Sequence, residues 1–358
     1  MSNKYNKGEW SELYAFLYSL TNGVIYGADE DLNKDKNIKY NVVSAFQSDI
    51  EYMRNLEKEI VEFIINGESY FVTIEDLKNN TERLFYQIKD GRGSTFEIPD
   101  IESLIEKLGI RTLKAGNRLK GDLVLKIHDP MIASEPVLSF SVKSHIGSKP
   151  TLVNSSKGTN FLFKIASASG SEELSNEVVG EINGITGSGK IKKRISEIYD
   201  KGNTLELKEV SSAVFSRNLK MIDFKMPEIL AALCLESYFV KGKRIPDVVD
   251  SYAANNSLED KGLIEYKVKQ FLIACALGMV PLTPWEGLEE ANGGYLVVKD
   301  DADVLCYHIY NRNKLSQYLY THTTFDTPST SRYSVGKILN DQITGERNFR
   351  LNLQIRFS

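Results

Sequence analysis

The stretch that decides the fold is GDLVLKIHD at residues 121–129, followed by PVLSFSVKS at residues 136–144. Each segment alternates apolar and polar side chains with the period of two that a half-buried β-strand requires. The apolar faces consist of Leu123, Leu125 and Ile127 in the first segment and of Leu138, Phe140 and Val142 in the second. The opposite faces place Asp122, Ser141 and Lys143 on one side of a predicted sheet.

This combination of residues indicates nuclease chemistry. A carboxylate beside a lysine on paired strands can hold a divalent cation and activate a water molecule against a phosphodiester. A cross-strand pair of Asp and Lys is also a common surface ion pair of small energetic value. The surroundings favour the functional interpretation, because a helix is predicted near the N-terminus and a run of polar residues follows Lys143.

The composition is that of a globular protein. The chain has 358 residues, enough for two domains or for one large domain with an elaborated half. Apolar residues make up 42% and charged residues 26%, both ordinary values. No apolar run reaches the ~18 residues of a membrane span, and MSNKYNKGEW at the start lacks the apolar core of a signal peptide. We therefore expect a cytoplasmic protein without a membrane partner.

Cysteine usage and net charge restrict the function only weakly. Cys234, Cys275 and Cys306 are widely spaced and show no CxxC pattern, so we expect buried thiols rather than disulfides or a zinc cluster. The net charge of −4 argues against a surface that is positive throughout. A nuclease needs basic residues only where DNA lies, so this charge does not exclude DNA binding.

Periodicity predicts further helices and strands around the quoted segments. Residues 9–20 form an amphipathic helix with a buried stripe of Trp10, Leu13, Phe16 or Leu17, and Leu20. Other helices are predicted at residues 47–66, 74–88, 94–108, 226–240, 259–279 and 314–319, and within residues 171–199. Strands are predicted at residues 38–46, 69–74, 160–166 and 349–357, with a hairpin at 295–310. The first third then forms a largely helical cover before a sheet that starts near Arg118.

A glycine-rich loop interrupts the helical pattern at residues 180–189. Within it, GITGSGK at residues 184–190 has some character of a phosphate-binding loop. Ile191 follows Lys190 where such a loop has Ser or Thr, and no hydrophobic strand precedes it. The nucleotide-binding pattern is therefore incomplete.

Asp122, followed after residues 123–140 by Ser141-Val142-Lys143, resembles the PD-(D/E)xK nuclease core. The resemblance implies an α/β fold, with a mixed central sheet flanked by helices and a large C-terminal α+β elaboration. It also implies a catalytic site of Asp122, Ser141 and Lys143 that uses Mg²⁺. Ser141 stands where the family usually has an acid, so the site is one carboxylate short.

Some members of this superfamily carry the missing acid on a helix, and GEWSEL at residues 8–13 is similar to that helix glutamate. The resemblance implies Glu12 as a second metal ligand beside Asp122, because Glu12 sits deeper in the helix than Glu9. Glu9 and Glu135 remain alternatives.

A more specific resemblance covers nearly the whole chain. It rests on KGEWSELY at residues 7–14, on SFSVKSHIGSKPTLVNSSKGTNFLFKI at residues 139–165 and on NLQIRF at residues 352–357. These stretches are similar to the HpaII family of type II restriction endonucleases. The resemblance implies cleavage of double-stranded DNA within CCGG, although related members could read other GC-rich sites. A homodimer is possible, and a cytosine methyltransferase is the expected genetic partner.

We expect residues 1–170 to hold the N-terminal helices and the nuclease core, and residues 171–358 to form a DNA-recognition region. One continuous fold is the alternative. Phosphates and bases offer acceptors and donors that polar and basic side chains match. The candidate DNA-binding residues are His145, Ser148, Lys149, Asn154, Asn160, Arg312, Asp326 and Arg332.

Two other functions stay open on the sequence. A repair or junction-resolving nuclease would share the core but read the shape of DNA. A DNA-binding module with a decayed nuclease site would explain Ser141.

Overall fold

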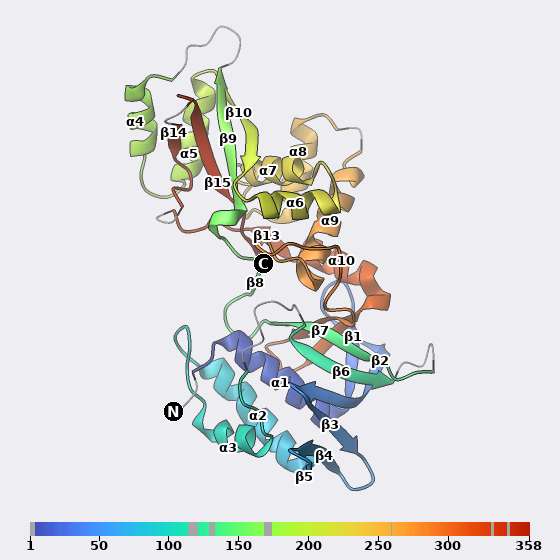
Figure 1. Ribbon diagram of the computed structural model, residues 1–358. Helices are drawn as coiled ribbons and strands as arrows, with labels where there is room; N and C mark the ends of the chain where they lie inside the picture. The colour runs from blue at the N-terminus through green and yellow to red at the C-terminus, as the bar shows by residue number, and fades with distance from the viewer. Residues whose placement is uncertain are drawn as a thin grey trace. The chain divides into compact units, whose positions relative to one another are not determined.

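The computed structural model describes residues 4–113, 121–128, 133–167, 174–258, 260–330, 333–341 and 344–358 (Figure 1). The chain forms two compact units, each assembled from separate segments. The first unit comprises Met1–Pro150, Ala276–Gly278 and Leu288–Tyr318, and the second comprises Thr151–Cys275, Met279–Gly287 and Leu319–Ser358. The assignment of a nuclease role to residues 1–170 and of DNA recognition to residues 171–358 stays a prediction.

The first unit is built on a mixed nine-stranded sheet in the order β1-β12-β11-β7-β6-β2-β3-β4-β5. Its strands are β1 (Val24–Ala28), β2 (Lys34–Gln47), β3 (Ile50–Asn55), β4 (Ile60–Ile65), β5 (Glu68–Thr73), β6 (Leu123–His128), β7 (Val137–Ser144), β11 (Gly294–Val298) and β12 (Val304–His308). The β1–β12 and β11–β7 pairs are parallel, and the other pairs are antiparallel. Because β1 also pairs with β2, six of these strands close into a ring.

Helices accompany this sheet, so the predicted combination of helices with a mixed sheet is confirmed, whereas the PD-(D/E)xK arrangement of the core stays a prediction. They are α1 (Lys7–Asn22), α2 (Ile74–Asp90), α3 (Pro99–Lys107) and, further along the chain, η2 (Ile309–Asn311) and α10 (Arg312–Thr321). Helix α1 contacts β7, β2 and β6 as well as α2. The predicted stripe of Trp10, Leu13, Phe16, Leu17 and Leu20 is buried, which removes the apolar face of α1 from water.

The two quoted segments form the β6–β7 hairpin, as their alternation predicts. Leu123, Leu125 and Ile127 are all buried, and Leu123 pairs with Phe140. Ser141 is also fully buried, so the polar face of β7 is covered at this position.

Two predictions for the first third were wrong. Residues 47–66 form the β3–β4 hairpin instead of a helix, and the sheet starts at β1 rather than near Arg118. The dense charges at residues 51–62 suggested a solvated helix face, but the burial of Val61 and Phe63 alternates with period two. Glu59 takes a left-handed φ of 55° in the connecting turn, which ends any helix there.

Most other predictions for secondary structure are confirmed. The predicted elements at residues 38–46, 69–74, 74–88, 94–108 and 295–310 correspond to β2, β5, α2, α3 and the β11–β12 hairpin. Strand β1 escaped prediction because VIYGA has only 5 residues, too few for a clear periodic pattern.

The second unit contains two antiparallel sheets and several helices. One sheet has the order β10-β9-β15-β14, from β10 (Asn203–Val210), β9 (Asn160–Ser167), β15 (Arg347–Asn352) and β14 (Ile338–Asn340). The other has the order β13-β16-β8, from β13 (Thr323–Phe325), β16 (Ile355–Phe357) and β8 (Thr151–Val153). The helices are η1 (Lys157–Thr159), α4 (Asn176–Gly184), α5 (Lys190–Asp200), α6 (Ala213–Ile222), α7 (Met226–Glu236), α8 (Ile245–Asn255) and α9 (Gly262–Leu277). The strand predicted at residues 349–357 is therefore divided between two sheets.

Cys234, Cys275 and Cys306 are buried thiols. Within the described ranges, the structure contains no helix with the length and apolar character of a membrane span.

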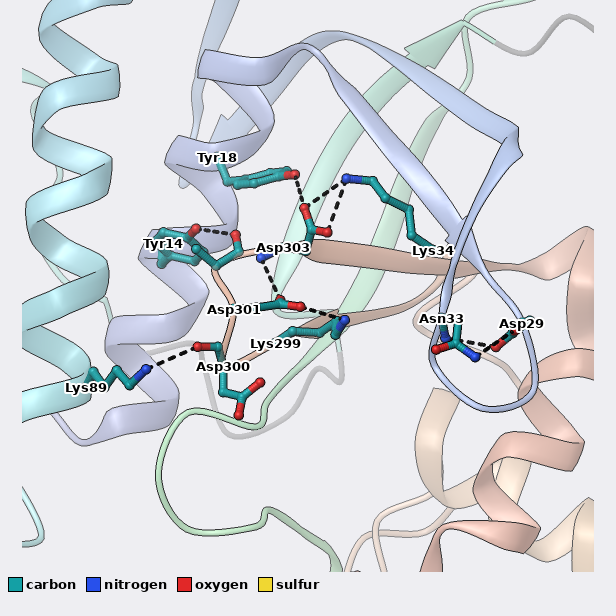
Figure 2. Close-up of polar contacts among 11 residues, drawn as sticks. Tyr14, Tyr18, Asp29, Asn33, Lys34, Lys89, Lys299, Asp300, Asp301 and Asp303 are labelled. Carbon is teal, nitrogen blue, oxygen red and sulfur yellow. Dashed lines mark hydrogen bonds and ion pairs between the residues drawn. The ribbon is translucent and has the colours of Figure 1, made fainter.

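The turn between β11 and β12 fastens α1 to the sheet (Figure 2). Tyr14 donates a hydrogen bond from its hydroxyl to the carbonyl of Ala302. Asp303 forms an ion pair with Lys34 of β2 at 2.9 Å and accepts a hydrogen bond from Tyr18 at 3.4 Å. These contacts fix α1, and with it any side chain that α1 carries toward the sheet.

Candidate active site

Asp122 stands immediately before β6 and is held in place by β7. Its peptide N–H donates to the carbonyl of Phe140 at 2.8 Å, one residue out of the Leu123–Phe140 register, so the pairing is irregular at this end of the hairpin. Its carboxylate Oδ2 accepts a hydrogen bond from the peptide N–H of Val142 at 2.7 Å and one from Ser141 Oγ at 3.3 Å. Two donors of one strand thus orient the carboxylate.

Lys143 completes the arrangement predicted from the alternation of β7. Its Nζ lies 3.9 Å from Asp122 Oδ2 and donates to the carbonyl of Val142 at 3.2 Å. The side chains of Lys143 and Asp122 are 25% and 15% exposed, so the pair is accessible but largely shielded from water. The structure therefore brings Asp122, Ser141 and Lys143 together, and their catalytic roles stay predictions.

Glu12 belongs to the same electrostatic cluster. Burial, and after it the nearby charge of Asp122, raise the pKa of its carboxyl group to about 8, although Lys143 acts to lower it. The charges on β6 and β7 are thus close enough to Glu12 of α1 to change its ionisation.

The two alternative acids have other partners. Glu9 closes a capping box at the start of α1, where it accepts from the peptide N–H of Asn6 at 2.7 Å while Asn6 accepts from the peptide N–H of Glu9 at 3.0 Å. Glu135 lies toward the opposite end of the β6–β7 hairpin, 3.6 Å from Lys126 and 4.0 Å from His128. Helix capping and a surface ion pair explain these two residues.

The donor set suits a hard divalent cation. Asp122 and Glu12 supply carboxylate oxygens, which are the ligands that Mg²⁺ prefers. Their mutual repulsion in a shielded place would be offset by a cation bound to both. Among the described residues, no group of three or more His, Cys, Asp and Glu side chains is arranged for a metal, which agrees with a serine at position 141.

One residue of this region escaped the sequence analysis. Tyr295 of β11 pairs in register with Ser141 on one side and with Tyr307 of β12 on the other. Register partners on adjacent strands share a face of the sheet, so the row from Asp122 and Ser141 continues to Tyr295. Only the pairing of β11 with β7 could have revealed this residue, because Tyr295 and Ser141 are 154 positions apart in the sequence (295 − 141).

Four candidate DNA-binding residues lie in the first unit. The ring of His145 is half-buried, with Nε2 3.1 Å from the hydroxyl of Tyr318. Ser148 and Lys149 are exposed in the loop after β7. Arg312 starts α10 and forms an ion pair with Glu289.

The other candidates belong to the second unit or are not described. Asn154 is exposed, whereas Asn160 is buried and accepts a hydrogen bond from Asn352 Nδ2 at 2.7 Å, which indicates a structural role. Asp326 forms an ion pair with Arg356 at 3.2 Å. Arg332 lies outside the described residues.

Comparison with known proteins identifies the family to which the chain belongs. The family model of the HpaII restriction endonuclease matches residues 6–357. The type II restriction enzyme HpaII of Haemophilus parainfluenzae is 39% identical over 363 residues, which cover 98% of each chain. No solved structure shows a significant match. The chain therefore belongs to the HpaII restriction endonuclease family and is a type II site-specific deoxyribonuclease, which favours restriction over a junction nuclease or a decayed module.

Proposed function

We propose that this enzyme cleaves double-stranded DNA at a short GC-rich site, CCGG, in a Mg²⁺-dependent site of the PD-(D/E)xK type. The observation that supports it most directly is the Asp122–Lys143 pair on adjoining strands, with Glu12 of α1 in the same charge cluster. Asp122 and Glu12 would hold the cation, and Ser141 and Lys143 would complete the site. We also propose a cytoplasmic location, because an enzyme that cleaves double-stranded DNA would meet its substrate there.

Mg²⁺ would supply a Lewis acid that neutralises phosphate charge and lowers the pKa of bound water. The protein's part is to keep the ligands in place. The Val142 peptide N–H and the Ser141 hydroxyl both donate to Asp122, so its carboxylate is oriented before DNA arrives. Lys143 then orients the attacking water and stabilises negative charge that develops on the scissile phosphate.

Guanine offers O6 and N7 acceptors in the major groove, and cytosine offers an N4 donor. Arg332 and Arg312 match guanine, Asp326 matches cytosine, and His145, Ser148, Lys149 and Asn154 match phosphate oxygens. We keep Asn160 with this set as a residue that shapes the loop through Asn352. A palindromic site suits a homodimer, and the genetic partner would be a cytosine methyltransferase acting on the same sequence.

Digestion of a plasmid tests both the specificity and the metal. With Mg²⁺, we expect discrete fragments whose sequenced ends all fall within CCGG. With excess EDTA, we expect no cleavage, while Ca²⁺ supports DNA binding without cutting. Fragments with ends at unrelated sequences would disprove the specificity, and undiminished cleavage in chelator would disprove the metal mechanism.

Methylation of the site should protect the DNA. A 5-methyl group on the cytosine of CpG projects into the major groove beside the N4 donor. Loss of a base contact costs about 1–3 kcal/mol, which corresponds to roughly 5- to 150-fold weaker binding, and misplacement of the scissile phosphate slows cleavage further. We therefore expect CpG-methylated CCGG duplexes to be cut at least tenfold more slowly than unmethylated ones in a gel assay. Equal rates would show that the CpG edge is not read closely.

A further inference from the structure

The Tyr295 hydroxyl is an unexplained polar group beside the proposed site. Tyr295 is fully buried, and its hydroxyl makes no hydrogen bond among the described residues. Buried hydroxyls almost always have a partner, because leaving one unpaired forfeits its hydration. A phenylalanine would fill the same space without that penalty.

Two neighbouring tyrosines, Tyr307 and Tyr318, do have partners for their hydroxyl groups. Tyr307, the register partner of Tyr295, donates to the carbonyl of Asp29 at 2.7 Å. Tyr318 stacks on Tyr307 with ring centroids 4.8 Å apart, and its hydroxyl lies 3.1 Å from His145 Nε2. Of these three tyrosines, Tyr295 is the one whose hydroxyl has no hydrogen-bond partner among the described residues.

The position of Tyr295 connects it with the carboxylate of Asp122. Ser141 is its register partner on β7, and Ser141 Oγ contacts Asp122 Oδ2 at 3.3 Å. Burial raises the pKa of Tyr295 well above its ordinary value, and the charges of Tyr318 and Asp122 raise it further. The hydroxyl is therefore protonated and is a hydrogen-bond donor within the electrostatic reach of Asp122.

We propose that Tyr295 is a positioning residue of the cleavage site, whose hydroxyl donates toward the Asp122–Ser141 pair when the site is hydrated for catalysis and thereby fixes the orientation of Asp122. This inference rests on the proposed function of Asp122. It gives β11 a part in orienting Asp122. Because Tyr295 is buried, it contacts neither DNA nor the scissile phosphate.

The test compares Tyr295→Phe with Tyr307→Phe, which removes a hydroxyl of the same kind from the next strand. For Tyr295→Phe we expect the single-turnover rate with Mg²⁺ to fall about tenfold or more. DNA affinity at saturating Ca²⁺, measured by fluorescence anisotropy, should stay at the wild-type value, and the melting temperature should stay equal or rise. For Tyr307→Phe we expect a lower melting temperature and an unchanged rate at 25 °C.

A wild-type rate for Tyr295→Phe would overturn the inference, as would a rate loss matched by Tyr307→Phe. Lys143→Ala in the same assay separates this failure from that of the proposed site. If Lys143→Ala still cleaves, the site itself is wrong. If Lys143→Ala is inactive while Tyr295→Phe is fully active, only the role of Tyr295 is lost.

The double variant Tyr295→Phe with Ser141→Ala tests whether the two residues act together on Asp122. A loss of cleavage rate smaller than the product of the two single losses supports a shared action, and independent losses count against it.

Discussion

Lys143→Ala is expected to abolish cleavage while DNA binding in Ca²⁺ stays close to the wild-type affinity. The Lys143 ammonium lies 3.9 Å from Asp122 Oδ2 and is the only cation that an ion pair joins to Asp122 among the described residues. Without this ammonium group, the attacking water lacks a charge that orients it, and the negative charge that develops on the scissile phosphate is not compensated. Loss of one such stabilising group typically costs roughly 100- to 1,000-fold in rate.

Single-turnover cleavage of a short CCGG duplex measures this loss, and anisotropy measures binding. Lys126→Ala is a matched control, because Lys126 lies on the partner strand of the same hairpin and pairs with Glu135. We expect Lys126→Ala to cleave normally. Turnover by Lys143→Ala at the wild-type rate would remove the basis of the proposed site.

Glu12→Gln is expected to lower the cleavage rate by roughly 100-fold or more, because it removes one of two carboxylates available to the cation. Gln is nearly isosteric and stays neutral, so the packing of α1 is preserved. Ser141→Ala should cost much less. It removes one donor to Asp122, while the Val142 peptide N–H still donates at 2.7 Å.

Glu9→Gln is the control for the helix, one turn before Glu12. Glutamine can still accept from the Asn6 peptide N–H, so the capping box and the activity should both survive. Rates are compared over a Mg²⁺ titration together with melting temperatures. Equal tolerance of the two substitutions would show that Glu12 serves only packing, and Glu135 would be the next acid to test.

The sequence predicted the central part of this site because its signal is local. Asp122, Ser141 and Lys143 lie on two strands joined by a short connection, and alternation alone assigns them to one face. The helix of residues 9–20 was also predicted, from its apolar stripe. The role of Glu12 on that helix came instead from the resemblance of residues 8–13 to the helix glutamate of related nucleases, and it stays a prediction.

Contacts between distant segments were beyond such reasoning. The pairing of Tyr295 with Ser141 follows from the parallel register of β11 and β7, for which no local pattern exists. The β3–β4 hairpin was mistaken for a helix because charged residues alternate with apolar ones at spacings that fit both periods. Burial of Tyr52, Val61 and Phe63 decided in favour of strands.

The closed ring of strands also governs the order in which the enzyme can be completed during synthesis. Strands β1, β2, β6 and β7 leave the ribosome early, but β11 and β12 begin only at Gly294 and Val304. Until then, β7 and β1 each lack a neighbour and present unpaired backbone groups. A nascent or truncated chain that ends before Gly294 therefore lacks two strands of the ring, and the host's DNA meets a finished nuclease only after most of the polypeptide has been made.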